Sequence, residues 1–285
     1  MKKIISILLI FLEIFLITYS KEITKEFILT IKIFIYNLMP VLFFQLTITE
    51  LLKNIDIDRI IPKSIENIFN ITKKEAFIIL LSMLSGYPNN IKLLKEKDNE
   101  YLNYASNYVN PIFILTVVSK IYIKNIKIGI IILISHILSN IILLYILRNK
   151  YNKEDYKNSN NLNLSYTLNN TVTTLKIILT NLLFISIFIT LLKIILPFNN
   201  IIKSLLIGLT EFSRGIYEIS LLNISIYLKG LLITIIITFQ SISIHFQIIS
   251  INSKIKYIKF LLYRLLNVLI SSIIYIFLIY LMYKI

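Results

Sequence analysis

The sequence predicts an all-α polytopic membrane protein, built from two related halves with broken or re-entrant helices at its centre. Hydrophobic residues make up 56% of the 285 residues, and the mean hydropathy is +0.78, well outside the range of soluble domains. Helix-disrupting or ionisable residues break two apolar runs, SGYPNN at 85–90 and TEFSRG at 210–215. Backbone freed from a helix inside a bilayer must be satisfied by protein or a water-lined cavity, so paired breaks predict a binding site.

Apolar stretches recur along the whole chain, and several reach the roughly 20 residues that a spanning helix needs. They cover residues 4–19, 28–52, 77–94, 126–147, 172–196, 200–210, 230–251 and 257–283. We expect the shorter ones only to enter the membrane.

Residues 1–20 are expected to form an N-terminal transmembrane helix. Lys2 and Lys3 before an apolar run are typical of a signal peptide, but Glu13 interrupts that run and residues 18–20 match a cleavage site poorly. We therefore expect the helix to be retained.

The first half of the molecule is predicted to cover residues 21–147. It begins with a short charged loop at 21–27. Pro40 should bend the helix that follows, because proline lacks the N–H that an interior helical position donates. Residues 53–75 carry charges of both signs around Pro62 and predict a solvated loop, either a plain one or one with a short helix lying on the membrane surface.

The first break is flanked by clear helix-start signals. Thr72 and Glu75 have the spacing of a capping box, which predicts a helix beginning just before the apolar stretch. Beyond the break at Gly86, Asn110-Pro111 opens a further apolar segment, because asparagine suits the cap and proline the first helical turn.

A polar linker at 148–170 separates the halves, and the second half covers 171–285. The linker residues are rich in Asn, Lys, Ser and Tyr and have no apolar periodicity. The order of helix, broken segment and helix then recurs, which predicts an internal repeat. The segments that align are 40–49 with 181–190, and 85–94 with 210–219.

The formal net charge is +15, with lysines placed mostly at the ends of apolar segments. There they can anchor to anionic lipid headgroups, so we expect the lipid bilayer, and no nucleic acid, as a partner. The absence of cysteine excludes disulfides and thiolate metal sites. His136 and His245 have no acidic or histidine neighbours at ligand spacing, so no metal and no cofactor is expected. No catalytic motif is found, and we expect no enzyme.

The two breaks predict a site for a small anion. A helix that begins at mid-membrane presents free N–H groups and the positive end of its dipole, which suits a carboxylate. The candidate residues are Gly86, Pro88, Asn89 and Asn90 at the first break, and Glu211, Ser213, Arg214 and Gly215 at the second.

Arg214 is the leading candidate for contact with the substrate. Its guanidinium can hold a carboxylate through two hydrogen bonds, and its charge would be costly in apolar surroundings without a partner. Two other interpretations stay open. Glu211 lies three residues earlier and could pair with Arg214 as a structural bridge, or the whole stretch could lie at the membrane surface.

Three polar residues outside the breaks complete the candidate site. His245 is interpreted as a proton-sensitive gate or hydrogen-bond donor, or as an ordinary polar residue between helices. Gln247 lies nearby in the sequence. Asn110 is expected to cap a half-helix rather than to contact the ligand directly, although its side chain could do both.

Four motifs carry a resemblance to a known family. They are SGYPNNIK at 85–92, VNPIFIL at 109–115, TEFSRGI at 210–216 and SIHFQIIS at 243–250. In order and spacing, the chain resembles the sporulation integral membrane protein YlbJ family, whose nucleoside-recognition or gate domain is similar to parts of concentrative nucleoside transporters. The chain departs from the family at Asn89 and Asn90, where members typically carry small residues.

The resemblance implies transport of dipicolinate across the outer forespore membrane, from a protein in the mother-cell membrane of a spore-forming bacterium. Two alternatives stay open: a nucleoside or nucleobase transporter, and a non-transporting membrane factor for spore-envelope maturation. The expected partner is thus a small-molecule anion, while a coupling ion and a homo-oligomer are left open.

Overall fold

The computed structural model describes residues 2–53, 60–86, 100–148, 163–252 and 254–284. Throughout these ranges the regular secondary structure is helical, and no strand occurs in them. The predicted all-α fold is confirmed. The relation between two halves stays a prediction, because the segment that would match the second break continues into 87–99, outside the described residues.

The N-terminal part of the chain forms one long helical bar. After α1 (Lys2–Thr18), it runs through α2 (Ser20–Ile33), a π-helical turn (η1, Phe34–Leu38) and α3 (Met39–Lys53). The turn lies immediately before Pro40, where it accommodates the missing N–H. Residues 21–27, predicted as a loop, instead form the first turns of α2. Lysine and glutamate are good helix formers, and Glu26 finds charged partners there.

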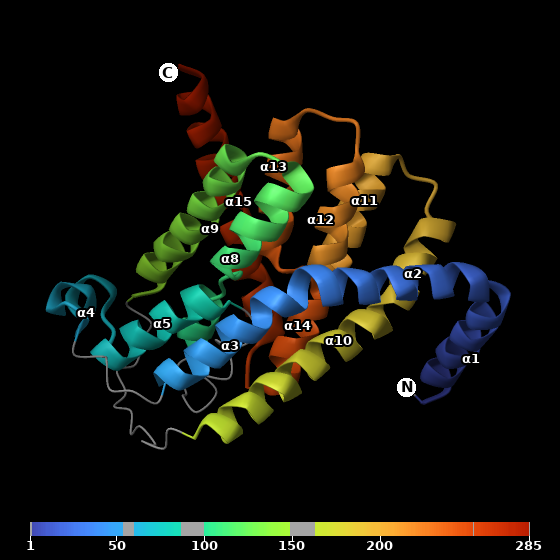
Figure 1. Cartoon of the computed structure of the whole chain (residues 1–285), viewed down its shortest axis with the longest axis horizontal. Helices are drawn as coiled ribbons and strands as arrows, with labels where there is room; N and C mark the ends of the chain where they lie inside the picture. Colours follow the sequence, from blue (N-terminus) through green and yellow to red (C-terminus); the bar gives the residue numbers. More distant parts are fainter. Residues whose placement is uncertain (1, 54–59, 87–99, 149–162, 253, 285) are drawn as a thin grey trace.

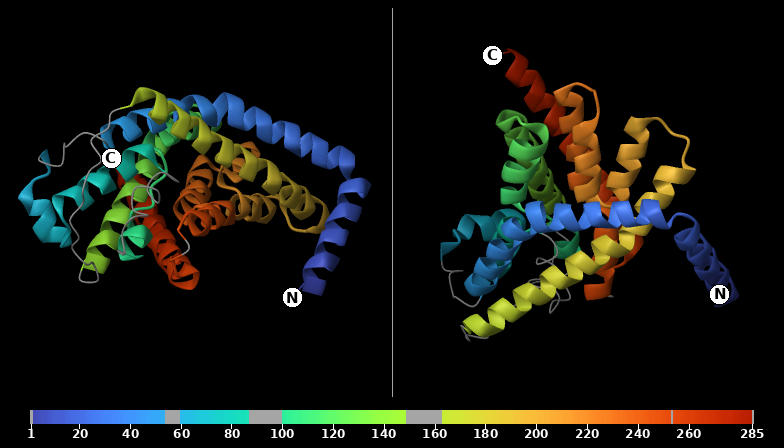
Figure 2. Two further views of the ribbon diagram at one scale, coloured as in Figure 1. Left: turned by 90° about the horizontal axis from the view of Figure 1, so that it is seen from below. Right: turned by 45° about the vertical axis from the view of Figure 1, so that its right-hand side comes forward.

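A second long helix, α10 (Leu164–Ile195), packs against this bar at both α2 and α3 (Figures 1 and 2). It begins within the stretch predicted as linker, where Asn163 caps it by accepting the Tyr166 N–H. The bar and α10 together form one outer layer of the molecule.

Behind this layer, three helices pack together as a bundle: α9 (Ile126–Leu147), α13 (Ile226–Phe239) and α15 (Tyr257–Lys284). The bounds of α9 coincide with an apolar stretch predicted from the sequence. A further helix, α14 (Ser241–Ile251), continues from α13 after a sharp joint at Gln240 and Ser241, which both have positive φ.

The first break is held by close backbone contact. The short helix α4 (Lys63–Phe69) precedes α5 (Lys73–Ser85), which begins with the predicted Thr72–Glu75 capping box. It ends at Gly86, whose φ is +70° and where an added Cβ would lie 2.5 Å from the Asn110 nitrogen. Only glycine suits this position.

The chain re-enters the described region as α7 (Glu100–Ala105) and then runs without helix through residues 106–110, all of them buried. Helix α8 (Pro111–Phe113) and the π-helical segment η3 (Ile114–Ile123) follow. Buried non-helical backbone thus lies directly before the Asn110-Pro111 cap.

The second break separates two short helices, α11 (Asn200–Thr210) and α12 (Phe212–Leu221), which fold back against each other. At 1.5 Å per residue they are roughly 16 and 15 Å long, about half of the ~30 Å bilayer core. Glycines allow the close approach, because a Cβ on Gly215 would lie 2.0 Å from the Cα of Gly208. The pair has the length of a re-entrant hairpin.

Within the described residues, 5 helical stretches are long and apolar enough to cross a membrane. They are Ser20–Leu52, Ile126–Leu147, Leu164–Ile195, Ile226–Ile251 and Tyr257–Lys284. The chain is therefore an integral membrane protein with several spans.

Candidate functional site

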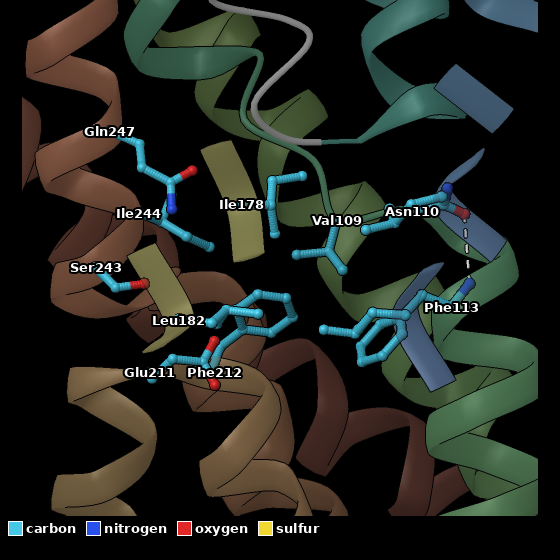
Figure 3. A pocket seen from close by; sticks show the side chains of 12 residues that line it. Val109, Asn110, Phe113, Ile178, Leu182, Glu211, Phe212, Ser243, Ile244 and Gln247 are labelled. Carbon is cyan, nitrogen blue, oxygen red and sulfur yellow. Dashed lines mark hydrogen bonds between the residues drawn. The ribbon is translucent and has the colours of Figure 1, made fainter. Parts of the chain in front are cut away.

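The second break, the Asn110 cap and the SIHFQIIS motif at 243–250 meet at one cavity, which we call the inner cavity (Figure 3). Its volume is about 50 Å³, which gives room for roughly three to five waters. The polar residues that line it are Asn110, Glu211, Ser243 and Gln247. The apolar lining consists of Leu38, Leu42, Val109, Phe113, Ile178, Leu182, Phe212 and Ile244.

The polar groups are not evenly spread around this cavity. Glu211, Ser243 and Gln247 lie on one side, and Asn110 lies on the other (Figure 3). Three predicted site residues, Asn110, Glu211 and Gln247, are thus brought together from segments far apart in the sequence.

Asn110 caps a helix and also faces the cavity. Its Oδ1 accepts the N–H groups of Ile112 at 2.8 Å and Phe113 at 3.3 Å. Its amide donates to the Ser85 carbonyl at 3.4 Å, next to Gly86. The first break is therefore fastened to α8 through this one side chain.

Glu211 plays the same part at the second break. It is only 2% exposed, and its carboxylate accepts the N–H groups of Ser213 at 3.2 Å and Arg214 at 2.7 Å. The Ser213 hydroxyl donates to it as well, at 2.6 Å. The helix N-terminus that was expected to receive an anionic ligand is thus occupied by a carboxylate of the chain itself.

Arg214 does not line the inner cavity. Its Nη2 contacts Glu26 at 2.7 Å and Glu218 at 2.8 Å. Lys193 bridges the same two acids, at 2.7 Å to each. We call Glu26, Lys193, Arg214 and Glu218 the charge ring.

The charge ring joins three helices, α2, α10 and α12, and its formal charges cancel. A structural bridge from Arg214 was one of the interpretations left open; Arg214 forms it with Glu26 and Glu218 rather than with Glu211. The Nε and Nη1 atoms of Arg214 are buried and have no hydrogen-bond partner among the described residues.

The two glycines among the candidate residues make close packing contacts. Gly215 packs on Gly208, and Gly86 packs on Asn110. Pro88, Asn89 and Asn90 lie outside the described residues.

His245 faces away from the inner cavity. Its Nε2–H donates to the Phe239 carbonyl at 2.9 Å, where α13 ends, and its ring lies against the rings of Phe239, Tyr257 and Phe260. Gln247, two residues on, lines the cavity, and its buried Oε1 has no partner among the described residues.

The sequence reasoning missed a second buried guanidinium, that of Arg264 in the middle of α15. Its side chain donates to the Tyr104 carbonyl at 2.6 Å and to Asn140 Oδ1 at 3.4 Å, so its bonded partners in the described structure are neutral. The sequence does indicate this residue, because Arg264 lies inside the apolar stretch 257–283, and an arginine within a membrane span usually faces the protein interior and has a structural or functional role.

His136 is a second buried residue whose contacts the sequence did not predict. The Val109 N–H donates to its Nε2 at 2.9 Å, so the ring proton is on Nδ1, which donates to Thr238 at 3.2 Å. The residue holds the non-helical segment before Asn110 against α9 and α13.

Comparisons with known proteins add no assignment: no protein-family model, no curated protein and no solved structure matches the chain.

Proposed function

We propose that the protein is a carrier that moves a small solute across a bacterial membrane, and that the solute binds in the inner cavity. The observation that supports this is the convergence of Asn110, Glu211 and Gln247 on one cavity inside an integral membrane protein. Ionisable and polar groups in such an interior cost free energy, and they are characteristic of solute and ion pathways. Discontinuous helices that meet near one site are typical of transporters.

The first candidate solute is the one that the resemblance implies, dipicolinate crossing the outer forespore membrane. Membership of the YlbJ family and a mother-cell location are parts of this proposal. Electrostatics adds a condition, since Glu211 lines the inner cavity and the described residues that line it include no cationic side chain. A dianion entering there needs a compensating cation, either a proton on Glu211 or a co-transported ion.

The second candidate is a nucleoside or nucleobase. The Glu211 carboxylate and the unpartnered Gln247 Oε1 are both acceptors, which suits the N–H donors of a base edge. A neutral solute needs no compensating charge.

Uptake into proteoliposomes tests the proposal. Labelled dipicolinate and labelled uridine are compared, each with and without an inward proton gradient. We expect dipicolinate uptake above that of protein-free liposomes, and we expect the proton gradient to increase it. In Glu211→Gln this increase should largely disappear, because glutamine keeps a cap acceptor but carries no charge.

Glu22→Gln is the matched control, since Glu22 is exposed on α2 and should leave uptake unchanged. Uptake of uridine alone would select the second candidate. If neither solute enters faster than in protein-free liposomes, the carrier proposal is wrong and a non-transporting membrane factor is favoured.

A further inference from the structure

A second and larger cavity, which we call the outer cavity, lies beside the inner one. Its volume is about 570 Å³. Its polar lining is Asn181, Thr210 and Ser243. Its apolar lining consists of three phenylalanines, Phe184, Phe188 and Phe246, and four aliphatic residues, Ile185, Leu191, Leu192 and Ile242. Phe184 and Phe246 are 60% and 64% exposed, so this cavity is open at the surface of the protein.

The two cavities share one wall. Ser243 of α14 lines both. On α10, Leu182 lines the inner cavity and Ile185 lines the outer one. At the second break, Glu211 lines the inner cavity and Thr210 lines the outer one. The wall is therefore a single layer of side chains from α10, α14 and the break between α11 and α12.

The joint that carries α14 is strained. Gln240 and Ser241 have φ values of +70° and +49°, a region that residues other than glycine rarely occupy. Both polar atoms of the Gln240 side chain and the Ser241 hydroxyl are buried without a partner in the described structure, and no side chain caps α14. A rearrangement of this joint would break no side-chain hydrogen bond of Gln240 or Ser241 in the described structure, so α14 is the side of the wall that can shift at the least cost.

We propose that the outer cavity is the vestibule through which the solute reaches the inner cavity, passing at Ser243. The inference rests on the proposed function. It also narrows the solute class, because phenylalanine faces stack on flat rings, while Asn181, Thr210 and Ser243 offer hydrogen bonds to a polar edge. The outer cavity therefore favours a small planar ring compound with polar substituents over a flexible aliphatic one.

The chain contains no cysteine, so single reporters can be introduced without removing native thiols. Leu182→Cys reports on the inner cavity and Phe246→Cys on the outer one. The probe is a charged, water-soluble methanethiosulfonate reagent applied to protein in liposomes. We expect Ser243→Phe to slow modification of Leu182→Cys about tenfold or more, since it overpacks the shared wall.

The matched control is Ser250→Phe, which makes the same change at an exposed position of α14 outside both cavities and should leave the rate unaltered. Thermal unfolding in detergent shows whether Ser243→Phe is folded, and we expect its midpoint to lie close to that of the parent. Modification of Leu182→Cys at the parent rate in folded Ser243→Phe would overturn the proposal.

A further outcome would also overturn it. If Phe246→Cys reacts only with a lipid-soluble maleimide and not with the charged reagent, an acyl chain fills the outer cavity. The modification rates can be measured in a protein that does not transport, so the vestibule and the carrier function are tested separately. If uptake is absent but Ser243→Phe still slows the modification, only the carrier function is contradicted.

Discussion

At the scale of single residues, the two arginines that are buried in the described structure are held by partners far away in the sequence. Arg214 contacts Glu26, 188 positions earlier, and Lys193 bridges the same acid to Glu218. In the charge ring each cation contacts both acids, so removal of one acid leaves two cations with a single counter-charge. Arg264 is stabilised differently, by a backbone carbonyl and an amide oxygen.

Glu26→Gln should therefore destabilise the protein. We expect the free energy of unfolding to fall by about 1–3 kcal/mol, between the values for exposed and fully buried ion pairs, because the ring is partly exposed. Thermal unfolding in detergent measures the change. Glu22→Gln, on the same helix but exposed, should leave the midpoint unaltered. Equal midpoints for the two variants would show that the ring contributes nothing to stability.

At the scale of elements, each described helix break is built from a side-chain cap and a tight backbone approach. Asn110 caps α8 beside Gly86, and Glu211 caps α12 beside the contact of Gly208 with Gly215. The caps satisfy the backbone N–H groups that a break leaves free, which a bilayer could not do. The glycines let the two arms come close enough to exclude lipid.

Gly215→Ala should force α11 and α12 apart. The added methyl would lie 2.0 Å from the Gly208 Cα and 2.5 Å from its nitrogen, and backbone atoms cannot move aside as a flexible side chain can. We expect a loss of about 1–3 kcal/mol of stability, together with loss of uptake. The control is Leu221→Ala, at the exposed end of α12. A fully stable, active Gly215→Ala protein would contradict the tight hairpin.

At the scale of the whole molecule, the outer layer of the α2–α3 bar and α10 crosses in front of the bundle of α9, α13 and α15 (Figures 1 and 2). The inner cavity is lined by η1, α3 and α10 of the outer layer and by α8, α12 and α14. The α11–α12 pair places Glu211 at this cavity, and we expect the pair to enter the membrane without crossing it, because each of its helices is too short to span the bilayer core.

This arrangement predicts which loops share a side of the membrane. Cysteines at Phe198 and Asn223, both exposed and at the two ends of the re-entrant hairpin, should react with an impermeant maleimide from the same side. A cysteine at the exposed Leu164, at the other end of the spanning α10, should react only from the opposite side. Labelling of Phe198→Cys and Asn223→Cys from opposite sides would mean that the hairpin crosses.

The features that the sequence predicted correctly are those set by neighbouring residues. Helices α9 and α11 have the bounds of the apolar stretches 126–147 and 200–210. The Thr72–Glu75 capping box and the cap at Asn110 formed where the spacing placed them. Residues 21–27 are the exception, since their charges indicated a loop although their local helix propensity is high.

The positions of α9 and α11, the caps at Thr72 and Asn110 and the membrane class were thus determined by the sequence alone, because apolar length and hydrogen bonding within one turn depend on residues close along the chain. Only the tertiary structure decided that Arg214 pairs with Glu26, that Glu211 rather than Arg214 reaches the inner cavity, and that Arg264 is buried against Asn140. These pairings depend on which helices pack together and on which face each helix presents to its neighbour. The sequence around a charged residue is the same whichever partner it contacts, so it does not reveal that partner.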